Sequence, residues 1–584
     1  MRMAHTRSGS LLGGAASLLL GLVMAAGLPG CEDGDGPAGK DGQNGLDGAP
    51  GADGADGADG ADGDSGTDGK DGADGKDAVL DASLSPIEKA FVFAGGKEAL
   101  AAIDGLRVTS EGTRWAVGEG VRPEDVLQTG TFTLTTSHDV AGDDLRLDYT
   151  RAIDFLGLGA NTTFSEIMQG QLGFVSGAES LFGLPEVGNM PSDRWGASRR
   201  QHQLLNPHLL LRAAALDPSI AHDAGAESLD GILYRKVKID DDVAPITLYV
   251  SDATGRIEKL TTLDNSYLLR DVEVEVFFTG WKVNDQEIAY PGEVFLSYDG
   301  HILHQDKRVG FEVNPTLEAD LFDFPAGADP KFDADEAERG AASHQFHEMF
   351  EAVGIGLDGP QNLTTPIPIA PGVWQLQGGL HNVGIVEQQD GLVMLDAPVH
   401  ELRSKAVIAW AKQQFPTKPI KHVIVTHFHE DHSGGVREIG AIGADVIVGE
   451  ASGDLFRRAV KASATVYPDT LSMDPKEVKV IEVEDGASFT IADPLRPVTA
   501  YHVDSSHSAD MLVIYVPESK ALWVTDIFGA STPPSILPFF VPFALELHGE
   551  LTNVHDLDVA LLFTGHGAGS NTFAQFEQLI GVAP

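Results

Sequence analysis

The sequence contains very little cysteine and few basic residues. Its 584 residues include one cysteine, Cys31, so we expect no disulfide within the chain. For the same reason no thiolate is available to a metal site elsewhere in the chain. Lysine and arginine number 40 against 87 aspartates and glutamates, which gives a formal net charge of −47. Such a surface favours solubility and repels nucleic acid, so we expect no nucleic-acid partner.

The chain starts with a pattern typical of protein export. Two arginines precede an apolar run over residues 11–28, and we predict a signal peptide over residues 1–30. Cys31 follows where a bacterial lipoprotein is cleaved and acylated, and acylation would anchor the chain without a spanning helix. The alternative is a plain signal peptide with an incidental cysteine. Because Glu32 is not the aspartate that often retains lipoproteins at the inner membrane, we expect an exported protein of the bacterial cell envelope, lipid-anchored at the outer membrane.

A collagen-like repeat follows the signal peptide. Glycine recurs at every third position for fourteen triplets over residues 36–77. Residues 32–77 carry 14 acidic and 3 basic side chains, whose repulsion opposes a stable triple helix. We therefore predict that residues 31–78 form a flexible acidic tether, with a trimerising stalk as the alternative.

The remaining length is too great for one core, so we expect further domains. Residues 79–325 open with the helix-start pattern Ser85-Pro86-Ile87-Glu88. Alternating strand-like runs follow at residues 131–135, 145–149, 232–239, 247–250, 257–262, 272–278 and 294–298. Asp299-Gly300 is a hairpin signal. These runs predict a curved antiparallel sheet with a helical insert at residues 204–216.

This order of elements resembles the half-barrel of lipoprotein carriers in the bacterial envelope. The resemblance implies that the concave face binds an acyl chain or positions the next domain. A packing domain without a ligand is the alternative. Residues 326–364 are rich in alanine, aspartate, glutamate and glycine, and we interpret them as a linker with one helix. His344 and His347 lie three apart on that helix, where we expect an exposed pair rather than metal ligands.

The most informative stretch is residues 425–435, Val-Thr-His-Phe-His-Glu-Asp-His-Ser-Gly-Gly. It follows a predicted strand at residues 421–425, and we expect a helix to begin near Gly434. In an extended segment His427 and His429 point the same way and can bind one ion. Asp431 and His432 follow on the turn and can reach a second ion. Imidazole and carboxylate ligands suit zinc and, to a lesser degree, iron or manganese.

This stretch resembles the signature T-H-x-H-x-D-H-x-G-G of the metallo-β-lactamase superfamily. Four further motifs of that family stand in the family order. They are Gly391–Asp396, Ser506–Pro517, Leu522–Asp526 and Phe563–Gly567. The resemblance covers residues 365–584. It implies an α/β fold, the αββα sandwich of two mixed sheets with helices outside.

The resemblance also implies a site for two cations. Each ion takes three ligands of its own, and one carboxylate bridges the pair. The first set is His427, His429 and His507, the second set is Asp431, His432 and His566, and the bridge is Asp526. Asp396 would support the ligand loop by hydrogen bonding. His502 is a rival for the third histidine, but His507 leads directly into an apolar strand as the motif requires. We expect His400, His422, His548 and His555 to be surface or structural residues.

Two zinc ions in such a site lower the pKa of a shared water and supply hydroxide as a nucleophile. They also polarise a carbonyl or phosphoryl oxygen. Asp431 would orient the nucleophile or assist the leaving-group proton. We therefore predict an enzyme that hydrolyses an ester, thioester, lactone or lactam of a small molecule. A mononuclear iron dioxygenase for persulfide-type substrates and a non-catalytic lipoprotein are the alternatives.

The substrate-binding residues are predicted from position alone. A β-hairpin over residues 372–386 corresponds to the family loop that overhangs the metals, so Trp374 and His381 are candidates for substrate contact. Core packing is the alternative for Trp374. Phe539 and Phe540 lie in the apolar, proline-rich residues 533–543, which would form a wall over the metals or pack on the second domain. Asp526 stands where true β-lactamases of the family have cysteine or serine. An aspartate at this position resembles the glyoxalase-II, lactonase and phosphodiesterase branches of the family.

Overall fold

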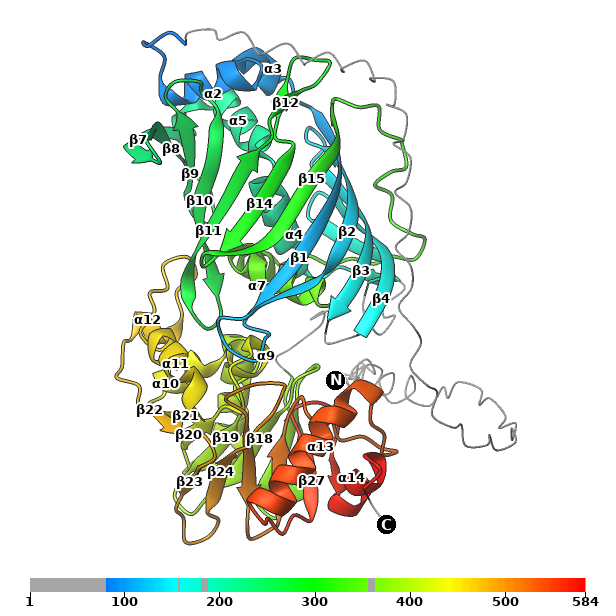
Figure 1. Cartoon of the computed structure of the whole chain (residues 1–584), viewed down its shortest axis with the longest axis vertical. Helices are drawn as coiled ribbons and strands as arrows, with labels where there is room; N and C mark the ends of the chain where they lie inside the picture. The colour runs from blue at the N-terminus through cyan, green and yellow to red at the C-terminus, as the bar shows by residue number, and fades with distance from the viewer. Residues whose placement is uncertain (1–79, 156–157, 180–186, 355–362, 583–584) are drawn as a thin grey trace, which may run out of the picture. The chain divides into compact units, whose positions relative to one another are not determined.

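The structure is a computed structural model that describes residues 80–155, 158–179, 187–354 and 363–582. The predicted signal peptide, the acylation site at Cys31 and the acidic tether lie outside the described residues. The described chain contains a sheet domain, residues 80–354, and a sandwich domain, residues 363–582 (Figure 1). Among the described helices, none combines the length and apolar character needed to cross a membrane.

The sheet domain begins with the helix that the sequence predicts. Helix α2 (Pro86–Ala94) starts with a capping box, in which the Ser85 hydroxyl accepts a hydrogen bond from the Glu88 amide. In return the Glu88 carboxylate accepts one from the Ser85 amide at 2.8 Å. These bonds satisfy amides that a helix start leaves without partners. Helix α3 (Lys97–Ala101) follows.

The sheet has thirteen antiparallel strands, which confirms a β-rich antiparallel domain. Its order is β6-β5-β4-β3-β2-β1-β15-β14-β11-β10-β9-β8-β7. The bounds are β1 (Gly105–Val117), β2 (Val126–Asp139), β3 (Asp144–Phe155), β4 (Leu158–Gln169), β5 (Leu172–Ala178), β6 (Val187–Asn189), β7 (Ala221–Leu229), β8 (Ile232–Ile239), β9 (Ile246–Ser251), β10 (Ile257–Ser266), β11 (Arg270–Thr279), β14 (Glu293–Tyr298) and β15 (His301–Val313). Strands β12 (Lys282–Val283) and β13 (Ala289–Tyr290) form a separate ribbon. The seven predicted runs fall within β2, β3, β8, β9, β10, β11 and β14.

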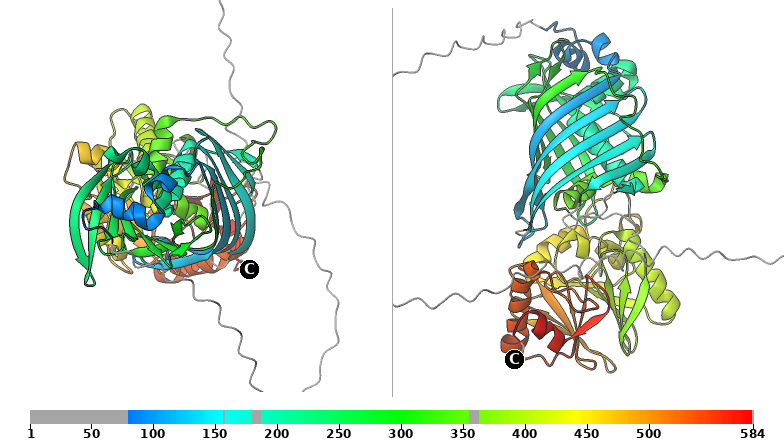
Figure 2. Two further views of the ribbon diagram at one scale, coloured as in Figure 1. Left: turned by 90° about the horizontal axis from the view of Figure 1, so that it is seen from above. Right: turned by 90° about the vertical axis from the view of Figure 1, so that its right-hand side faces the viewer.

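The strands curve around helices that fill the concave side (Figure 2). The helical insert predicted at residues 204–216 corresponds to α5 (Pro207–Leu216), and the helical region begins earlier than predicted, with α4 (Ser192–Leu205). A short 3₁₀ turn, η1 (Pro218–Ile220), returns the chain to the sheet. Leu204 and Leu211 are buried in the main core of this domain together with Val276 and Leu296 from the strands. Burial of such side chains is the principal force that holds helix against sheet.

Residues 334–352 correct the prediction of a linker with an exposed histidine pair. Helices α6 (Ala334–Ala342) and α7 (His344–Ala352) pack into the sheet domain, where Phe346 and Phe350 lie in a buried cluster. His344 is 1% exposed, and its Nδ1 lies 2.6 Å from Asp264 Oδ1. Apolar residues repeat at helical spacing along α7 and give it a buried face, which overrides the polar composition of the segment.

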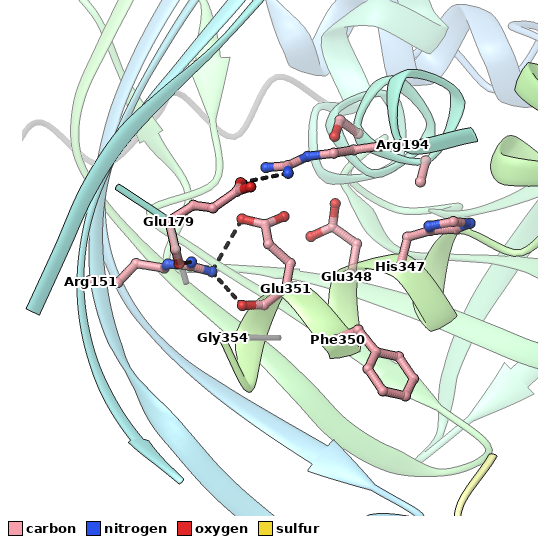
Figure 3. Close-up of a pocket in the computed structure, with 10 residues that line it drawn as sticks. Arg151, Glu179, Arg194, His347, Glu348, Phe350, Glu351 and Gly354 are labelled. Atoms are coloured by element: carbon pink, nitrogen blue, oxygen red, sulfur yellow. Dashed lines mark hydrogen bonds and ion pairs between the residues drawn. The ribbon is translucent and has the colours of Figure 1, made fainter. Parts of the chain in front are cut away.

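Charged groups lie on the concave side of the sheet. Glu348 and Glu351 of α7 form ion pairs with Arg114 and Arg151 of the sheet at 2.8 and 3.2 Å. A cavity beside α7 is lined by Arg151, Glu348 and Glu351 together with Glu179 and Arg194 (Figure 3).

The sandwich domain has the two mixed sheets that the sequence predicts. The first sheet runs in order through β16 (Thr365–Ala370), β17 (Val373–Gln377), β18 (Val383–Glu387), β19 (Leu392–Leu395), β20 (Ile420–Ile424), β21 (Asp445–Gly449) and β22 (Val480–Val483). The second runs through β23 (Ser488–Ile491), β24 (Val498–His502), β25 (Leu512–Val516), β26 (Ala521–Val524), β27 (Leu561–Thr564) and β28 (Ser570–Thr572). Val393, Ile424 and Ile514 belong to the core shared by the two sheets.

Helices cover the outer faces of both sheets. They are α8 (Glu401–Gln414), α9 (Glu430–Ser433), α10 (Val436–Ala441), η2 (Glu450–Ser452), α11 (Gly453–Ala459), α12 (Thr470–Met473), η3 (Pro538–Phe540), α13 (Val541–Gly549), η4 (Glu550–Val554) and α14 (Phe573–Leu579). Val407 and Trp410 of α8 pack on the first sheet, and Ala544 and Leu547 of α13 pack on the second. The helix expected near Gly434 starts earlier, at Glu430, and Gly434 ends its first short segment.

Candidate metal centre

The histidine-rich loop starts where β20 ends, and Asp396 fixes its first residue. The Asp396 carboxylate accepts hydrogen bonds from the amide of Thr426 at 2.7 Å and from its hydroxyl at 2.8 Å. Its other oxygen accepts a hydrogen bond from Trp523 Nε1 at 2.9 Å. Asp396 is fully buried and is thus placed at the base of the loop without being one of the clustered metal-ligand candidates.

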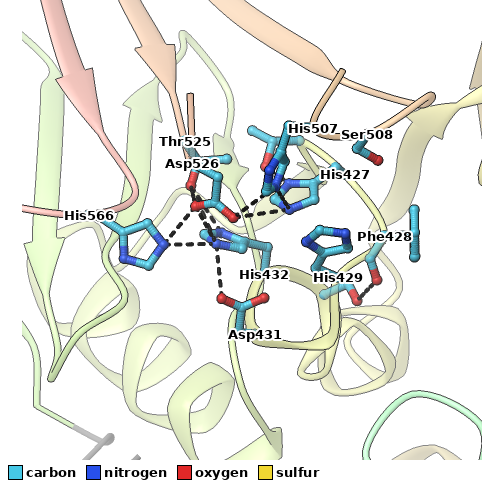
Figure 4. Close-up of polar contacts among 12 residues, drawn as sticks. His427, Phe428, His429, Asp431, His432, His507, Ser508, Thr525, Asp526 and His566 are labelled. Carbon is cyan, nitrogen blue, oxygen red and sulfur yellow. Dashed lines mark hydrogen bonds and ion pairs between the residues drawn. The ribbon is translucent and has the colours of Figure 1, made fainter. Parts of the chain in front are cut away.

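The structure gathers the predicted ligand residues into two adjoining groups (Figure 4). Within each group, one candidate ligand atom per residue lies within 4.8 Å of the others. The first group is His427, His429, His507 and Asp526, and the second is His381, Asp431, His432 and His566. The members come from the loop after β20, from residues before β25, from the ends of β26 and β27, and, for His381, from the connection between β17 and β18. Carboxyl ends of neighbouring strands thus carry most of the site, as is common for loops on a rigid scaffold.

Asp526 lies between the two groups and turns one oxygen to each. Its Oδ2 is 3.2 Å from His427 Nε2 and 3.3 Å from His507 Nε2. Its Oδ1 is 3.0 Å from His432 Nε2 and 2.7 Å from His566 Nε2. A carboxylate in this position can bridge two cations.

The imidazole nitrogens converge in a way that suits a cation. His432 Nε2 and His566 Nε2 lie 3.1 Å apart, and His427 Nε2 and His507 Nε2 lie 3.4 Å apart. Two neutral imidazoles that both direct lone pairs inward repel one another unless a proton or a metal ion lies between them. The donor set of imidazoles and carboxylates is the one that zinc, iron and manganese accept.

Charges within the site shift its pKa values. Burial lowers the pKa of His432, but the carboxylates of Asp431 and Asp526 outweigh burial and raise it well above the usual value. Burial raises the pKa of Asp526, but His432 and His566 outweigh burial and hold it well below the usual range. Burial lowers the pKa of His429 well below its usual value. Asp526 and His432 therefore stabilise each other's charged form.

His381 lies deeper in the site than the sequence predicts. We expected a substrate contact, but its Nε2 lies 2.9 Å from Asp431 Oδ2 and it belongs to the second ligand group. Burial lowers the pKa of His381 to about 4, against the opposing effect of Asp431. A neutral imidazole can then donate its Nε2 hydrogen to Asp431 and hold that carboxylate in place.

The aromatic candidates for substrate contact are placed differently. Trp374 packs against Trp410 of the outer helix at a ring distance of 6.1 Å, which is the core-packing alternative. Phe539 and Phe540 contact each other with tilted rings whose centroids are 4.0 Å apart, and no contact of theirs with a ligand residue is found among the described residues. Phe543, on the same apolar segment, lies against His507 at 5.6 Å.

The histidines that the sequence sets aside lie outside both groups. His502 accepts a hydrogen bond from the Gly486 amide at 2.9 Å and has its Nε2 3.1 Å from the Ala509 carbonyl. His507, rather than this rival, faces Asp526. The other four histidines make structural contacts. His422 pairs with Asp445, His548 pairs with Glu577, His400 caps α8, and His555 contacts the His502 carbonyl.

Sequence reasoning missed a contribution from the sheet domain. Glu119, on the loop between β1 and β2, forms a third group of possible ligands with His429 and Asp431. The next residue, Gly120, accepts a hydrogen bond from His429 Nε2 at 2.9 Å through its carbonyl. This bond leaves Nδ1 as the lone-pair nitrogen of His429. The two segments are 309 residues apart in the sequence, and no local pattern around Glu119 indicates the contact.

Comparisons with known proteins agree with this picture. A model of the metallo-beta-lactamase superfamily matches residues 376–566, and a model of the collagen triple helix repeat matches residues 23–79. The chain is 22% identical over 186 residues to the 2,4-dinitroanisole O-demethylase subunit alpha of Nocardioides sp. (strain JS1661), covering 32% of this chain and 52% of that one. It is 34% identical over 79 residues to a linear primary-alkylsulfatase of Pseudomonas sp, covering 13% of this chain and 12% of that one. The chain thus spans about half of the first relative and a small part of the second.

Three of the similar solved structures are metallo-beta-lactamases. They include FIM-1 from Pseudomonas aeruginosa in its mono-zinc form, with 18% identity and a TM-score of 0.29 over 38% of this chain and 94% of that chain. The enzyme from Pontibacter korlensis has 17% identity and a TM-score of 0.28 over 38% and 98%. The enzyme from Hirschia baltica has 17% identity and a TM-score of 0.29 over 38% and 99%.

Proposed function

Because the C-terminal region has the metallo-β-lactamase fold, we propose that this protein is a hydrolase that uses two zinc ions to cleave an ester, thioester, lactone or lactam. One observation carries the proposal. The two oxygens of Asp526 face two different pairs of histidines, at 2.7–3.3 Å. A mononuclear site needs no such second pair, so this arrangement favours two metal ions over one.

Bound zinc would supply an activated water at neutral pH and would polarise the scissile carbonyl or phosphoryl group. The protein residues around it position and exchange protons. Asp431 is fixed by His381 at 2.9 Å and lies 3.3 Å from His432 Nε2, so its carboxylate can orient the nucleophile and receive a proton. The side chain of His566 is 30% exposed while that of His427 is fully buried. The second ligand group is therefore the side from which a substrate can approach.

Two features of the site indicate the substrate class, namely the bridging carboxylate of Asp526 and the apolar surface beside His507. An aspartate at position 526 favours the glyoxalase-II, lactonase and phosphodiesterase branches over true β-lactamases. Phe543 beside His507 provides an apolar surface next to the first ligand group and suits an acyl or ring substrate. The names of the two curated relatives add an aryl methyl ether and an alkyl sulfate to the compounds worth assaying.

Metal analysis of the purified chain tests the proposal first. About two zinc ions per chain support the hydrolase and justify a panel of esters, thioesters, lactones and lactams. One iron per chain would replace the proposal with a mononuclear dioxygenase. No retained metal after reconstitution would leave a non-catalytic lipoprotein.

A pair of variants then tests the mechanism. Asp431→Ala should abolish turnover because it removes a ligand and the proton-accepting carboxylate together. Asp504→Ala, an exposed aspartate near His507, serves as the matched control and should keep wild-type turnover. Retained turnover in Asp431→Ala would contradict the mechanism.

We also propose that the protein is lipid-anchored in the cell envelope through Cys31, with the acidic repeat as its tether. The support is the sequence pattern of an apolar run followed by a lone cysteine. Detergent phase partitioning of the wild type and of Cys31→Ser tests this. The wild type should enter the detergent phase and the variant should stay in the aqueous phase.

A further inference from the structure

We propose that Glu119 of the sheet domain is a further carboxylate ligand of the metal centre. This inference rests on the proposed metal-dependent function and adds a residue that the metallo-β-lactamase motifs do not contain. It means that the centre is built by two domains, since the other candidate ligands belong to the sandwich domain.

The loop that carries Glu119 has a defined shape of its own. It connects β1 and β2 over residues 118–125. The Arg122 amide donates to Asp125 Oδ2 at 2.8 Å, and the Asp125 amide donates to the Arg122 carbonyl at 3.0 Å. A Cβ atom at Gly120 would come within 2.4 Å of Asp125 Cβ, so only glycine fits the closed turn. Glu119 directly precedes this closed turn.

The backbone of the same loop is bonded to the sandwich domain at two points. The Gly120 carbonyl accepts a hydrogen bond from His429 Nε2 at 2.9 Å. The Val121 carbonyl accepts one from the Ala509 amide at 2.8 Å. His429 is itself a member of the first ligand group, and Ala509 lies two residues after His507 of the same group. The loop is therefore fixed directly at the site.

The Glu119 side chain is buried there without a hydrogen-bond partner for one of its oxygens. The residue is 7% exposed, and Oε1 has no partner within the part of the chain that the structure describes. A candidate ligand oxygen of Glu119 lies within 4.8 Å of ligand atoms of His429 and Asp431. His429 belongs to the first ligand group and Asp431 to the second, so Glu119 reaches both.

A cation accounts for this placement. A ligand-type oxygen of Glu119 lies within 4.8 Å of one of Asp431, and both residues are buried, where two carboxylates without a compensating positive charge are costly. Neither Arg nor Lys is paired with Glu119 among the described ion pairs. A divalent cation coordinated by these carboxylates removes the repulsion and satisfies the free oxygen at once.

The experiment compares metal retention in the full chain and three variants. Glu119→Gln keeps the volume of the side chain and removes its charge, and Glu119→Asp keeps the charge on a shorter side chain. Glu124→Gln changes an exposed glutamate of the same loop and is the matched control. Each protein is loaded with zinc, dialysed against graded chelator and analysed for metal. The visible spectrum is then recorded after loading with cobalt, and circular dichroism checks folding.

If Glu119 is a ligand, Glu119→Gln weakens retention of at least one ion about tenfold or more and changes the cobalt spectrum, whereas Glu124→Gln changes neither. Glu119→Asp should fall between Glu119→Gln and the wild type. Wild-type retention and spectrum in a folded Glu119→Gln would overturn the role of Glu119 and leave the two-zinc centre intact. A wild-type chain that retains no zinc would instead overturn the proposed function itself.

Discussion

The carboxylate of Glu430 accepts a hydrogen bond from the hydroxyl of Ser266 at 2.8 Å. The same oxygen accepts a second hydrogen bond from the amide of Leu268 at 2.7 Å. Glu430 stands between His429 and Asp431 in the ligand loop, while Ser266 and Leu268 lie on the hairpin between β10 and β11. The sheet domain thus holds the ligand loop from a second side, separate from the Glu119 loop.

Glu430→Ala should destabilise the protein and loosen the metal centre. It removes the acceptor of the Ser266 hydroxyl and the closer of the two acceptors of the Leu268 amide, which keeps only Ser266 Oγ at 3.1 Å. Losing these buried hydrogen bonds should cost about 1–3 kcal/mol in the free energy of unfolding. Denaturant titration measures this loss, and chelator competition measures the accompanying loss of metal affinity. Glu477→Ala, at an exposed glutamate, is the control and should change neither quantity. An unchanged metal affinity in Glu430→Ala would show that the hairpin does not support the ligand loop.

Asp469→Asn should remove an acid-sensitive connection between the domains. Arg437 donates to Asp469 Oδ2 at 2.6 Å and to Oδ1 at 3.1 Å, and Arg270 of β11 lies 3.7 Å away. Burial raises the pKa of Asp469, but the hydrogen bonds from Arg437 and the charge of Arg270 outweigh it and lower the pKa to about 2. Breaking a buried charge pair on one side costs about 3–5 kcal/mol at neutral pH.

The sign of the pH dependence follows from the lowered pKa. The stability that Asp469 contributes is complete above its usual pKa of 3.8 and is lost as the pH falls through about 2. The difference in unfolding free energy between the wild type and Asp469→Asn should therefore be constant near neutrality and shrink between about pH 4 and pH 2. Denaturant titrations at several pH values test this. A difference that grows on acidification would refute the assignment.

Asp396→Asn should weaken metal binding while leaving the fold intact. Asp396 adopts a positive φ of 62°, which asparagine tolerates well, so the backbone is preserved. The asparagine side chain has an NH₂ group in place of one carboxylate oxygen, so it cannot accept the hydrogen bonds from both Thr426 and Trp523. Loss of such a supporting contact typically costs 10–100-fold in metal affinity. Competition with a zinc indicator measures the change, with the exposed Asp390→Asn as the control.

Leu268→Ala should show that the two domains unfold as one unit. Leu268 lies on the β10–β11 hairpin, is 4% exposed, and packs in the same core cluster as Leu376 and Val423 of the sandwich domain. Removing it should lower the unfolding free energy by about 2–5 kcal/mol and lower the temperature of a single calorimetric transition. Leu263→Ala, at a position 37% exposed on β10, should have little effect. Two separate transitions in the wild type would contradict the shared core.

The sequence predicts those parts of the site that are local. His427, His429, Asp431 and His432 fall within six residues, and their spacing alone indicates a metal loop. The strands of the sheet domain follow from alternation of apolar and polar residues, and α2 follows from its capping box. Helix α7 lies within the helix that the sequence predicts there, but its burial was missed although Phe346, Met349 and Phe350 carry a helical repeat, because the segment as a whole has a polar composition.

The contacts between domains could not be predicted in this way. His429 and Gly120 are 309 residues apart, and Ser266 and Glu430 are 164 apart. Nothing in the neighbourhood of Glu119 or Ser266 distinguishes them from surface residues of a β-hairpin. Their roles depend on how two folded cores pack together, and the residues next to them in the sequence carry no sign of that packing.

The packing of Leu268 into the core of the other domain has a consequence for how such a chain can evolve. A recombination event that replaced the sheet domain would leave an apolar hole beside Leu376. It would also remove the Ser266 hydroxyl and the Leu268 amide, which donate hydrogen bonds to Glu430. The sandwich domain would then inherit its ligands but not the framework that orders them. A substitution in the β10–β11 hairpin would therefore act on the ligand loop through Glu430 as well as on the core that the two domains share.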